Sequence, residues 1–272
     1  MQTWAREQER AGRRVAFVPT MGYLHEGHLS LVREARRRGD LTVVSIFVNP
    51  TQFGPNEDFS RYPRDFERDR HLCEAEGVDV IFAPSAEAMY PPGSCTRVFV
   101  EGMQDRLCGR SRPGHFMGVC TVVLKLFEIV RPAVAVFGWK DAQQFLILRR
   151  MVQDLNLPVE MIGVETVREP DGLACSSRNV YLSPEERRGA TILFRSLQQA
   201  RAMIEDEHRT DAASIRKEMT ALITQTPGAR LDYVEIVSMD TLEPLEQVRT
   251  GGTLIALAVY FGRTRLIDNI RV

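Results

Sequence analysis

The chain has 272 residues, with 35 basic and 36 acidic side chains and a formal net charge of −1. Hydrophobic residues make up 44% of it and charged residues 26%, as expected of a globular protein with one large or two modest domains. This near-neutrality argues against a nucleic-acid-binding protein, and no apolar run approaches the roughly 20 residues that span a bilayer.

The first segments predict a strand–helix–strand unit. The apolar run at 13–20 is typical of a buried strand, and the β-branched run at 41–48 predicts a second one. Between them, 27–38 has helical periodicity and ends at Gly39, a natural helix stop. We expect the crossover to be right-handed.

The same alternation continues to about residue 170. Helices are expected at about 60–76, around 116–130 and from Asp141 onward, and each leads into a short apolar strand. This rhythm predicts an α/β fold with a doubly wound parallel sheet over residues 1–170.

The pattern changes in the last third of the chain. Helices are predicted at 183–207 and 211–225, with Ser183 and Pro184 as N-cap and first residue of the first one. Three strands then follow without intervening helices, at 231–239, 252–262 and 264–272. Residues 171–272 are therefore expected to form a smaller C-terminal α+β domain.

The cysteines and the N-terminus suggest a compartment. The five cysteines are widely spaced and include no Cys-x-x-Cys pair, which favours reduced thiols over disulfides or a zinc site. The charged N-terminal stretch has no apolar core, so we expect no signal peptide and a cytoplasmic location.

The segment PTMGYLHEGH, residues 19–28, is the richest in chemistry. It joins a strand to a helix, where open α/β sheets bind ligands, and the helix N-terminus offers free N–H groups to an anion. His25 and His28 are three residues apart and should share a face, suited to stabilising phosphate charge during nucleotidyl transfer. A zinc site is the weaker interpretation, because no third ligand is evident.

Two further segments could hold phosphates. In GWKDAQQ, 138–144, Lys140 and Asp141 follow a strand and open a helix, although a surface lysine beside an Asp N-cap would look the same. In DGLACSSRN, 171–179, two hydroxyls and a guanidinium could form a mobile clamp for a polyphosphate. The sequence Ser-Ser-Arg alone is too common to decide this.

Polar groups that could hold a small substrate occur in two other segments. Asn49 and Gln52 in FVNPTQF supply neutral amides at the end of a strand, unless Asn49-Pro50 only sets a turn. Arg112 and His115 in RPGHFMGV precede a very apolar helix, where they could equally be loop and cap residues.

Taken together, these motifs resemble the pantothenate synthetase (pantoate–β-alanine ligase) family. PTMGYLHEGH, SIFVNPTQFGPNEDFSRYPR, RPGHFMGVCTVVLKLFEIVRP, FGWKDAQQ, DGLACSSRN and TRLIDNI occur in the order and spacing of that family, over nearly the whole chain. His25-Glu26-Gly27-His28 is similar to the HxGH signature of the nucleotidyltransferase superfamily, so the resemblance implies a Rossmann-like fold. Cys175 to Arg178 stand where class I aminoacyl-tRNA synthetases carry a KMSKS-like loop.

The resemblance implies a two-step ligation. Pantoate would attack the α-phosphate of ATP to give pantoyl adenylate and pyrophosphate, and β-alanine would then displace AMP to give pantothenate. It further implies His28 as proton donor, with His25, Lys140, Ser176, Ser177 and Arg178 acting on the phosphates. The implied nucleotide site comprises Met21, Gly22, Tyr23, Leu24, His25, Glu26, Gly27, His28, Gly138, Trp139, Lys140, Asp141, Val167, Cys175, Ser176, Ser177 and Arg178.

The resemblance also implies the remaining partners. Gln52 and Gln144 would hold pantoate, with Gln52 near β-alanine, and Asn49, Arg112 and His115 are further candidates in the same cleft. Asp69 is the candidate contact to Mg²⁺, and a homodimer is expected. The chain departs from the family at three positions, since Trp139 replaces a usual Glu, Ala142 a common aromatic residue and Cys175 a usual Met or Leu.

Two other functions compete with this interpretation. Another HxGH nucleotidyltransferase would transfer AMP to a phosphate, but Gln52 and Gln144, with no evident cationic pair, favour a carboxylate substrate. A catalytically silent nucleotide- or RNA-binding protein on the same scaffold is disfavoured by the retained histidines, Lys140 and Ser-Ser-Arg segment, and by the charge balance.

Overall fold

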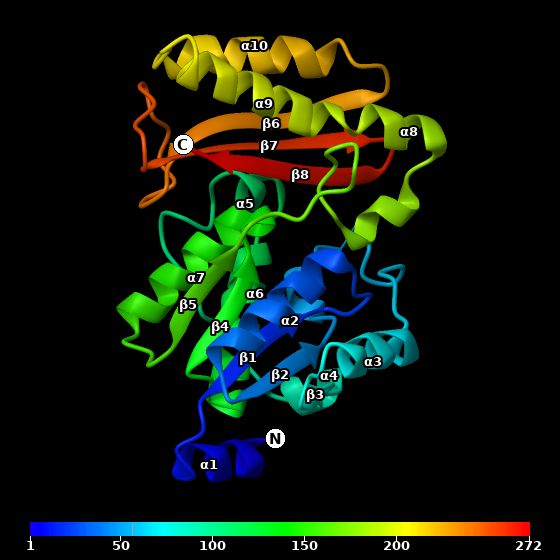
Figure 1. Cartoon of the computed structure of the whole chain (residues 1–272), viewed down its shortest axis with the longest axis vertical. Helices are drawn as coiled ribbons and strands as arrows, with labels where there is room; N and C mark the ends of the chain where they lie inside the picture. The colour runs from blue at the N-terminus through cyan, green and yellow to red at the C-terminus, as the bar shows by residue number, and fades with distance from the viewer. Residues whose placement is uncertain (56) are drawn as a thin grey trace.

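The computed structural model describes residues 1–55 and 57–272, and Figure 1 shows its two sheets one above the other. The lower sheet is parallel, with strand order β3-β2-β1-β4-β5. Its strands are β1 (Val15–Thr20), β2 (Leu41–Ile46), β3 (Val80–Phe82), β4 (Val134–Gly138) and β5 (Glu160–Val164). The chain winds outward from β1 in one direction and from β4 in the other, which confirms the predicted doubly wound α/β fold.

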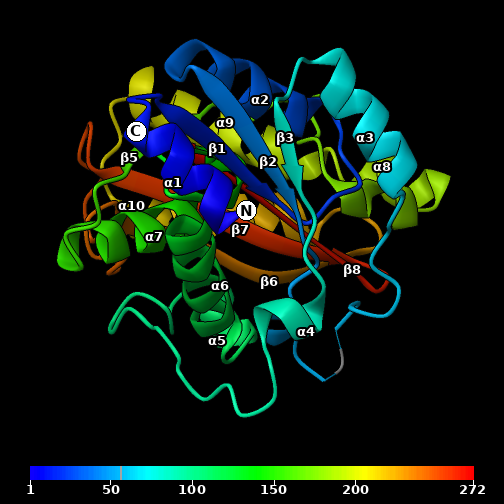
Figure 2. The same ribbon diagram turned by 90° about the horizontal axis from the view of Figure 1, so that it is seen from below.

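Helices cover both faces of the parallel sheet, as Figure 2 shows from below. Helix α2 packs on β1 and β4 from one side, and α6 and α7 pack from the other. The elements of this part are α1 (Gln2–Arg10), α2 (Glu26–Arg38), η1 (Pro50–Gln52), α3 (Phe66–Ala75), α4 (Ala86–Met89), α5 (Cys108–Ser111), α6 (His115–Val130), η2 (Trp139–Asp141) and α7 (Ala142–Asp154).

Two helix ends differ from the sequence prediction in detail. The helix expected from about residue 60 begins only at Phe66, because Asp65 caps it by accepting the backbone N–H of Arg68. Helix α2 does stop at Gly39, but in extended backbone with φ −132° and not in a left-handed cap. Glycine is needed there for close approach, since a Cβ would lie 2.8 Å from the backbone of Arg14 and Ala16.

The upper sheet is antiparallel, in the order β6-β7-β8. Its elements are η3 (Ser177–Tyr181), α8 (Pro184–Gly189), α9 (Ile192–Glu205), α10 (Ala212–Thr224), β6 (Ala229–Ser238), β7 (Thr253–Phe261) and β8 (Thr264–Arg271). Ser183 caps α8 as predicted, but the single helix expected at 183–207 is wrong. The helix is interrupted at Ala190–Thr191. The polar α8 buries no residue, whereas α9 must pack its apolar face on the sheet.

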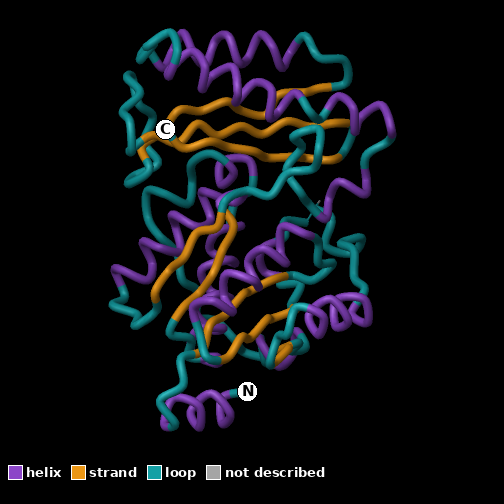
Figure 3. Tube along the Cα trace, in the orientation of Figure 1, coloured by secondary structure: helices purple, strands orange, loops and turns teal. Residues whose placement is uncertain are grey.

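The two faces of the upper sheet pack against different partners. One face forms an apolar core with α9 and α10. The other joins the main core through Tyr233 and Val237 of β6 and Ala256 of β7, which pack with α6 and α7. The small sheet is thereby fixed above the carboxyl ends of the parallel strands, as the tube in Figure 3 shows. A domain boundary at residue 170 stays a prediction.

None of the helices in the two described ranges is long and apolar enough to cross a membrane.

Candidate active site

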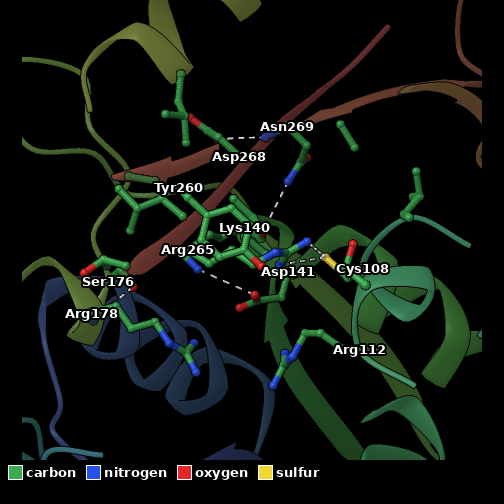
Figure 4. Close-up of a pocket in the computed structure, with 18 of the residues that line it drawn as sticks. Cys108, Arg112, Lys140, Asp141, Ser176, Arg178, Tyr260, Arg265, Asp268 and Asn269 are labelled. Carbon is green, nitrogen blue, oxygen red and sulfur yellow. Dashed lines mark hydrogen bonds and ion pairs between the residues drawn. The ribbon is translucent and has the colours of Figure 1, made fainter. Parts of the chain in front are cut away.

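A cavity of about 900 Å³ lies between the parallel sheet and the antiparallel sheet. It opens above the end of β4, one of the two central strands where the winding direction reverses, and the loop after β1 lies at the same switch point. The predicted residues that line it are Arg112, His115, Lys140, Asp141, Gln144, Ser176 and Arg178. Figure 4 shows Lys140, Asp141, Ser176, Arg178 and Arg112 around this space.

The loop after β1 reaches α2 through a left-handed turn. Gly22 has φ +80° and Tyr23 has φ +52°, a conformation that a non-glycine residue adopts only under constraint. Gly27 leaves room for the His25 ring, since a Cβ there would lie 2.9 Å from its Cε1. The loop thus delivers two imidazoles to the first turn of α2.

The two histidine rings lie side by side, with centroids 4.1 Å apart, which confirms that they share a face. Nδ1 of His28 accepts the backbone N–H of His25 at 3.3 Å, so the neutral ring carries its proton on Nε2. Burial, then the charge of Lys140, lowers the pKa of His25 to about 4. Burial, then His25, lowers the pKa of His28 well below its usual value. Both rings are therefore neutral hydrogen-bond donors at neutral pH.

Lys140 follows β4 and stands at the cavity beside Asp141, with Nζ 3.5 Å from its Oδ1. Its backbone is held by a residue that sequence reasoning did not assign. Asn269 of β8 donates from Nδ2 to the carbonyl oxygens of Trp139 at 2.8 Å and of Lys140 at 3.0 Å. The antiparallel sheet thereby fixes the turn that presents the ammonium group.

Several predicted nucleotide residues turn their side chains elsewhere. Trp139 is buried beside Phe145, with ring centroids 4.4 Å apart, and stacks against the Arg271 guanidinium at 4.1 Å. Leu24 is fully buried in the core under α2, and Glu26 is exposed and paired with Arg33. If Trp139, Leu24 and Glu26 contact a nucleotide, they do so through backbone atoms.

The segment Cys175 to Arg178 docks onto the loop before α3. Ser177 Oγ lies 3.1 Å from the Tyr62 hydroxyl, and Ser176 Oγ accepts the backbone N–H of Arg178. Arg178 makes two hydrogen bonds of 3.0 and 3.1 Å to the Asp58 carboxylate. Although burial opposes ionisation, these bonds hold the pKa of Asp58 below its usual range. Tyr62 and Asp58 are functional candidates that sequence reasoning missed.

The base of the same loop is fixed by backbone pairing. Cys175 donates its N–H to the carbonyl oxygen of Val167 at 2.9 Å. Its Cβ would lie 3.6 Å from a Cβ built at Gly27, so the loop runs beside the start of α2. All five cysteines are free thiols, as predicted.

A hydrogen-bonded network surrounds Gln52. Its Nε2 donates to the Met21 sulfur at 3.1 Å, and its backbone carbonyl accepts from Nδ1 of His115 at 2.8 Å. Arg112 donates to Nε2 of His115 at 3.0 Å and pairs with Glu57 through both of its carboxylate oxygens. Burial, then Arg112, lowers the pKa of His115 to about 3, so this ring is neutral.

The predicted amide side chains of Asn49, Gln52 and Gln144 differ in how many of their hydrogen-bonding groups already have a partner. Asn49 is 1% exposed, and its amide is occupied by Thr51, Gln52, Tyr90 and the carbonyl of Gly118, so it serves as scaffold. Gln144, on the first turn of α7, lines the cavity. Its neighbour Gln143 is buried and bonds to the backbone of the loop before α5.

Asp69 is buried and hydrogen-bonded to the loop after β1. Its carboxylate is 1% exposed, and its two oxygens accept the backbone N–H groups of Tyr23 and Leu24, each at 2.7 Å. Among the described residues, no group of three His, Cys, Asp or Glu side chains could hold a metal ion. The contact of Asp69 with Mg²⁺ stays a prediction, and in this structure each of its oxygens accepts a backbone N–H group.

Comparisons with known proteins match the whole chain. The model of the family "Pantoate-beta-alanine ligase" matches residues 1–271. A pantothenate synthetase from Heliobacterium modesticaldum is 60% identical over 272 residues, covering 100% of this chain and 96% of the relative. One from Acetivibrio thermocellus is 60% identical over 267 residues, covering 98% and 94%.

Solved structures agree with the sequence relatives. A crystal structure of pantothenate synthetase from Thermus thermophilus superposes with a TM-score of 0.92 at 50% identity, covering 98% of this chain and 97% of that one. A pantoate-β-alanine ligase from Francisella tularensis, described as complexed with "Beta-gamma ATP and Beta-alanine", has a TM-score of 0.80 at 34% identity, covering 98% and 94%.

Proposed function

The chain belongs to the pantoate-β-alanine ligase family, and from this premise we propose how its residues divide the work of joining pantoate to β-alanine. The reaction is ATP-dependent and forms pantothenate through pantoyl adenylate, with release of AMP and pyrophosphate. The observation that carries the division is that Lys140, Ser176 and Arg178 line one cavity where the parallel sheet changes direction, and that the charge of Lys140 helps to lower the pKa of both His25 and His28.

The first step is transfer of the adenylyl group. A carboxylate oxygen of pantoate attacks the α-phosphorus, the bond to the bridging oxygen breaks, and pyrophosphate leaves with that electron pair. The N–H groups of His25 and His28 donate hydrogen bonds to the α-phosphate oxygens as negative charge builds on these oxygens. Their neutrality is useful, because they stabilise the transition state through hydrogen bonds. A permanent cation at the same place would also bind pyrophosphate and slow its release.

The outer phosphates are proposed to lie between Lys140 and the Ser176–Arg178 segment. Lys140 supplies a compact charge, and Ser176 and Ser177 supply hydroxyl donors. Arg178 is already bound to Asp58, so the phosphate shares or replaces that carboxylate as its partner. The same charge then stabilises the departing pyrophosphate.

The second step uses the amide side of the site. The β-alanine nitrogen attacks the acyl carbon of pantoyl adenylate, the acyl C–O bond breaks, and AMP leaves while the amine loses a proton. We propose that Gln52 and Gln144 orient pantoate, with Gln52 near the amine. The network of Glu57, Arg112 and His115 supports Gln52 through its backbone carbonyl.

Mg²⁺ is proposed to enter with ATP. The described residues supply no cluster of three ligands for it, so the chain fits a cation carried mainly on phosphate oxygens and offers no cage of its own. Bound there, it would neutralise phosphate charge. No step above depends on a protein ligand to it.

Location, oligomeric state and domain division are proposals of the same kind. We place the enzyme in the cytoplasm as a homodimer, with two domains divided near residue 170. The unpaired thiols support a reducing compartment. Light scattering of the purified protein tests the dimer, and limited proteolysis near residue 170 tests the boundary.

The activity is tested by following AMP and pyrophosphate from ATP with and without each substrate. Pyrophosphate release should require pantoate but not β-alanine in the first turnover, and steady AMP formation should require both. If neither product depends on pantoate, the proposal is wrong. Formation of a dinucleotide with a phosphate substrate would instead identify another nucleotidyltransferase.

A further inference from the structure

The turn that leads into the histidine pair is held from outside its own element. Tyr23 has φ +52°, and an L-residue pays a steric penalty for that conformation which glycine does not. Such a residue persists where its surroundings over-determine it, and these conformations are concentrated at functional sites. The question is which group supplies the constraint here.

The constraint comes from a carboxylate far away in the sequence. Asp69, in the first turn of α3, accepts the backbone N–H of Tyr23 with Oδ2 and of Leu24 with Oδ1, both at 2.7 Å. Oδ2 lies so close to Gly22 that a Cβ there would be 2.9 Å away. One buried side chain therefore bonds to two successive residues of the turn and leaves no room for a side chain at the residue before them.

Asp69 is buried beside the histidine pair. It is 1% exposed, and the residue after its second partner is His25, the N-cap of α2. The carboxylate also suits its partners, because two convergent backbone N–H groups need two acceptors and a carboxylate has no donor to oppose them.

We propose that Asp69 is a positioning residue for the nucleotide site, which holds the Gly22–Leu24 turn and thereby aims His25 and His28. This rests on the proposed function of the histidine pair in binding and activating ATP. The consequence is selective, because the amides proposed to hold pantoate lie on η1 and α7, and among the described residues of the loop after β1 the Gln52 amide hydrogen-bonds only to Met21, which precedes the residues that Asp69 holds. The site should therefore lose ATP before it loses pantoate.

The main test is Asp69→Asn, which keeps the shape but turns an NH₂ group toward one backbone N–H. We expect kcat/KM for ATP to fall about tenfold, mainly through KM, with KM for pantoate changed less than twofold. Affinity for a non-hydrolysable ATP analogue, measured by calorimetry, should fall in parallel. Asp79→Asn is the matched control, since Asp79 accepts the Thr42 N–H at 2.7 Å at the amino ends of β2 and β3, away from the carboxyl ends where the site lies.

A rescue experiment separates positioning from general stability. Tyr23→Gly removes the steric penalty of the left-handed turn, so adding Asp69→Asn to it should cost less than threefold in analogue affinity. This comparison holds even if Asp69→Asn alone lowers the melting temperature. Equal losses toward ATP and pantoate, or fully additive losses in the double variant, would overturn the proposal. Absence of pantoate-dependent pyrophosphate release in the wild type would instead refute the proposed function, and analogue binding would still test Asp69.

Discussion

The two loops proposed to face the phosphates are held in opposite ways. The His25–His28 loop continues directly from β1 into α2, and its backbone N–H groups donate to side chains, those of Tyr23 and Leu24 to Asp69 of α3 and that of His25 to His28. The Ser176–Arg178 segment is held by side chains that reach across to the loop before α3, through Tyr62 and Asp58. The first loop is held through its backbone by a buried carboxylate, while the second is held through its own side chains by a neighbouring loop.

This difference suggests a division between fixed and adjustable chemistry. Groups that stabilise charge in the transition state act best when they need no reorganisation, which suits the histidine pair. A segment that must admit ATP and release pyrophosphate gains from contacts that exchange with phosphate oxygens, as the Arg178–Asp58 pair can. The following predictions test that division, beginning with the fixed loop.

Replacing the fixed donor should have the largest effect. We expect His28→Ala to lower kcat by at least ~10²-fold, because it removes a pre-aimed N–H from the α-phosphate. The melting temperature should change little in comparison. Turnover is measured from pyrophosphate release at saturating substrates.

His71→Ala is the matched control, since His71 is an exposed histidine on α3 outside the cavity. Its turnover should equal that of the wild type. If His28→Ala also retained full turnover, the histidine pair would have no part in the chemistry, and the comparison between the loops would fail.

Removing the ammonium group of Lys140, which follows β4, should have the next largest effect. Lys140→Ala is expected to lower kcat/KM for ATP about 30-fold, because a charge-assisted contact to phosphate is lost. Lys140→Arg should recover only part of it, since the turn held by Asn269 presents a compact group. Full activity of Lys140→Arg would show that only the charge matters, and Lys217→Ala on exposed α10 provides the control.

Loosening the docked segment should have a smaller effect than either. Asp58→Asn keeps at most part of the two-bond contact with Arg178, so we expect kcat/KM for ATP to fall about tenfold. Asp154→Asn, which loosens only a surface pair with Arg150, should leave activity unchanged. Tighter ATP binding by Asp58→Asn would contradict the docking role, because it would mean that Asp58 chiefly competes with phosphate.

The sequence predicted the fixed loop much better than the docked one. Strand, turn glycines and the i, i+3 histidines are local signals, and they defined both the switch point and the shared face. Asp58 and Arg178 are 120 residues apart, and Ser177 and Tyr62 are 115 apart, so no periodicity could pair them. Such contacts appear only when two surfaces meet in the fold.

The sequence also does not show the backbone N–H groups that Asp69 accepts, because they lie 45 and 46 residues away along the chain. One prediction failed for a similar reason. The single helix expected at 183–207 has continuous helical propensity, but only packing on the antiparallel sheet decides where it must break. Tertiary packing overrode a correct local preference in that segment.

The smallest expected effect is on the pH dependence of folding stability, because the buried His115 ring is kept neutral. Because burial lowers the pKa of His115 to about 3, the unfolded chain binds a proton there below about pH 6.5 that the folded chain does not. Protonation therefore favours unfolding: stability is complete above that pH and falls as the pH decreases. Through this histidine alone, the free energy of unfolding should fall by about 1 kcal/mol between pH 7 and pH 5.5.

His115→Gln isolates that contribution, since the amide can still accept from Arg112 and donate to the Gln52 carbonyl. Urea unfolding at pH 7 and pH 5.5 should show a pH dependence about 1 kcal/mol smaller than in the wild type, whatever the absolute stability. His71→Gln should retain the wild-type dependence. An unchanged dependence in His115→Gln would mean that this ring is already protonated in the folded state, so the network behind Gln52 would hold a second positive charge beside Arg112 and the neutral imidazole inferred there would be wrong.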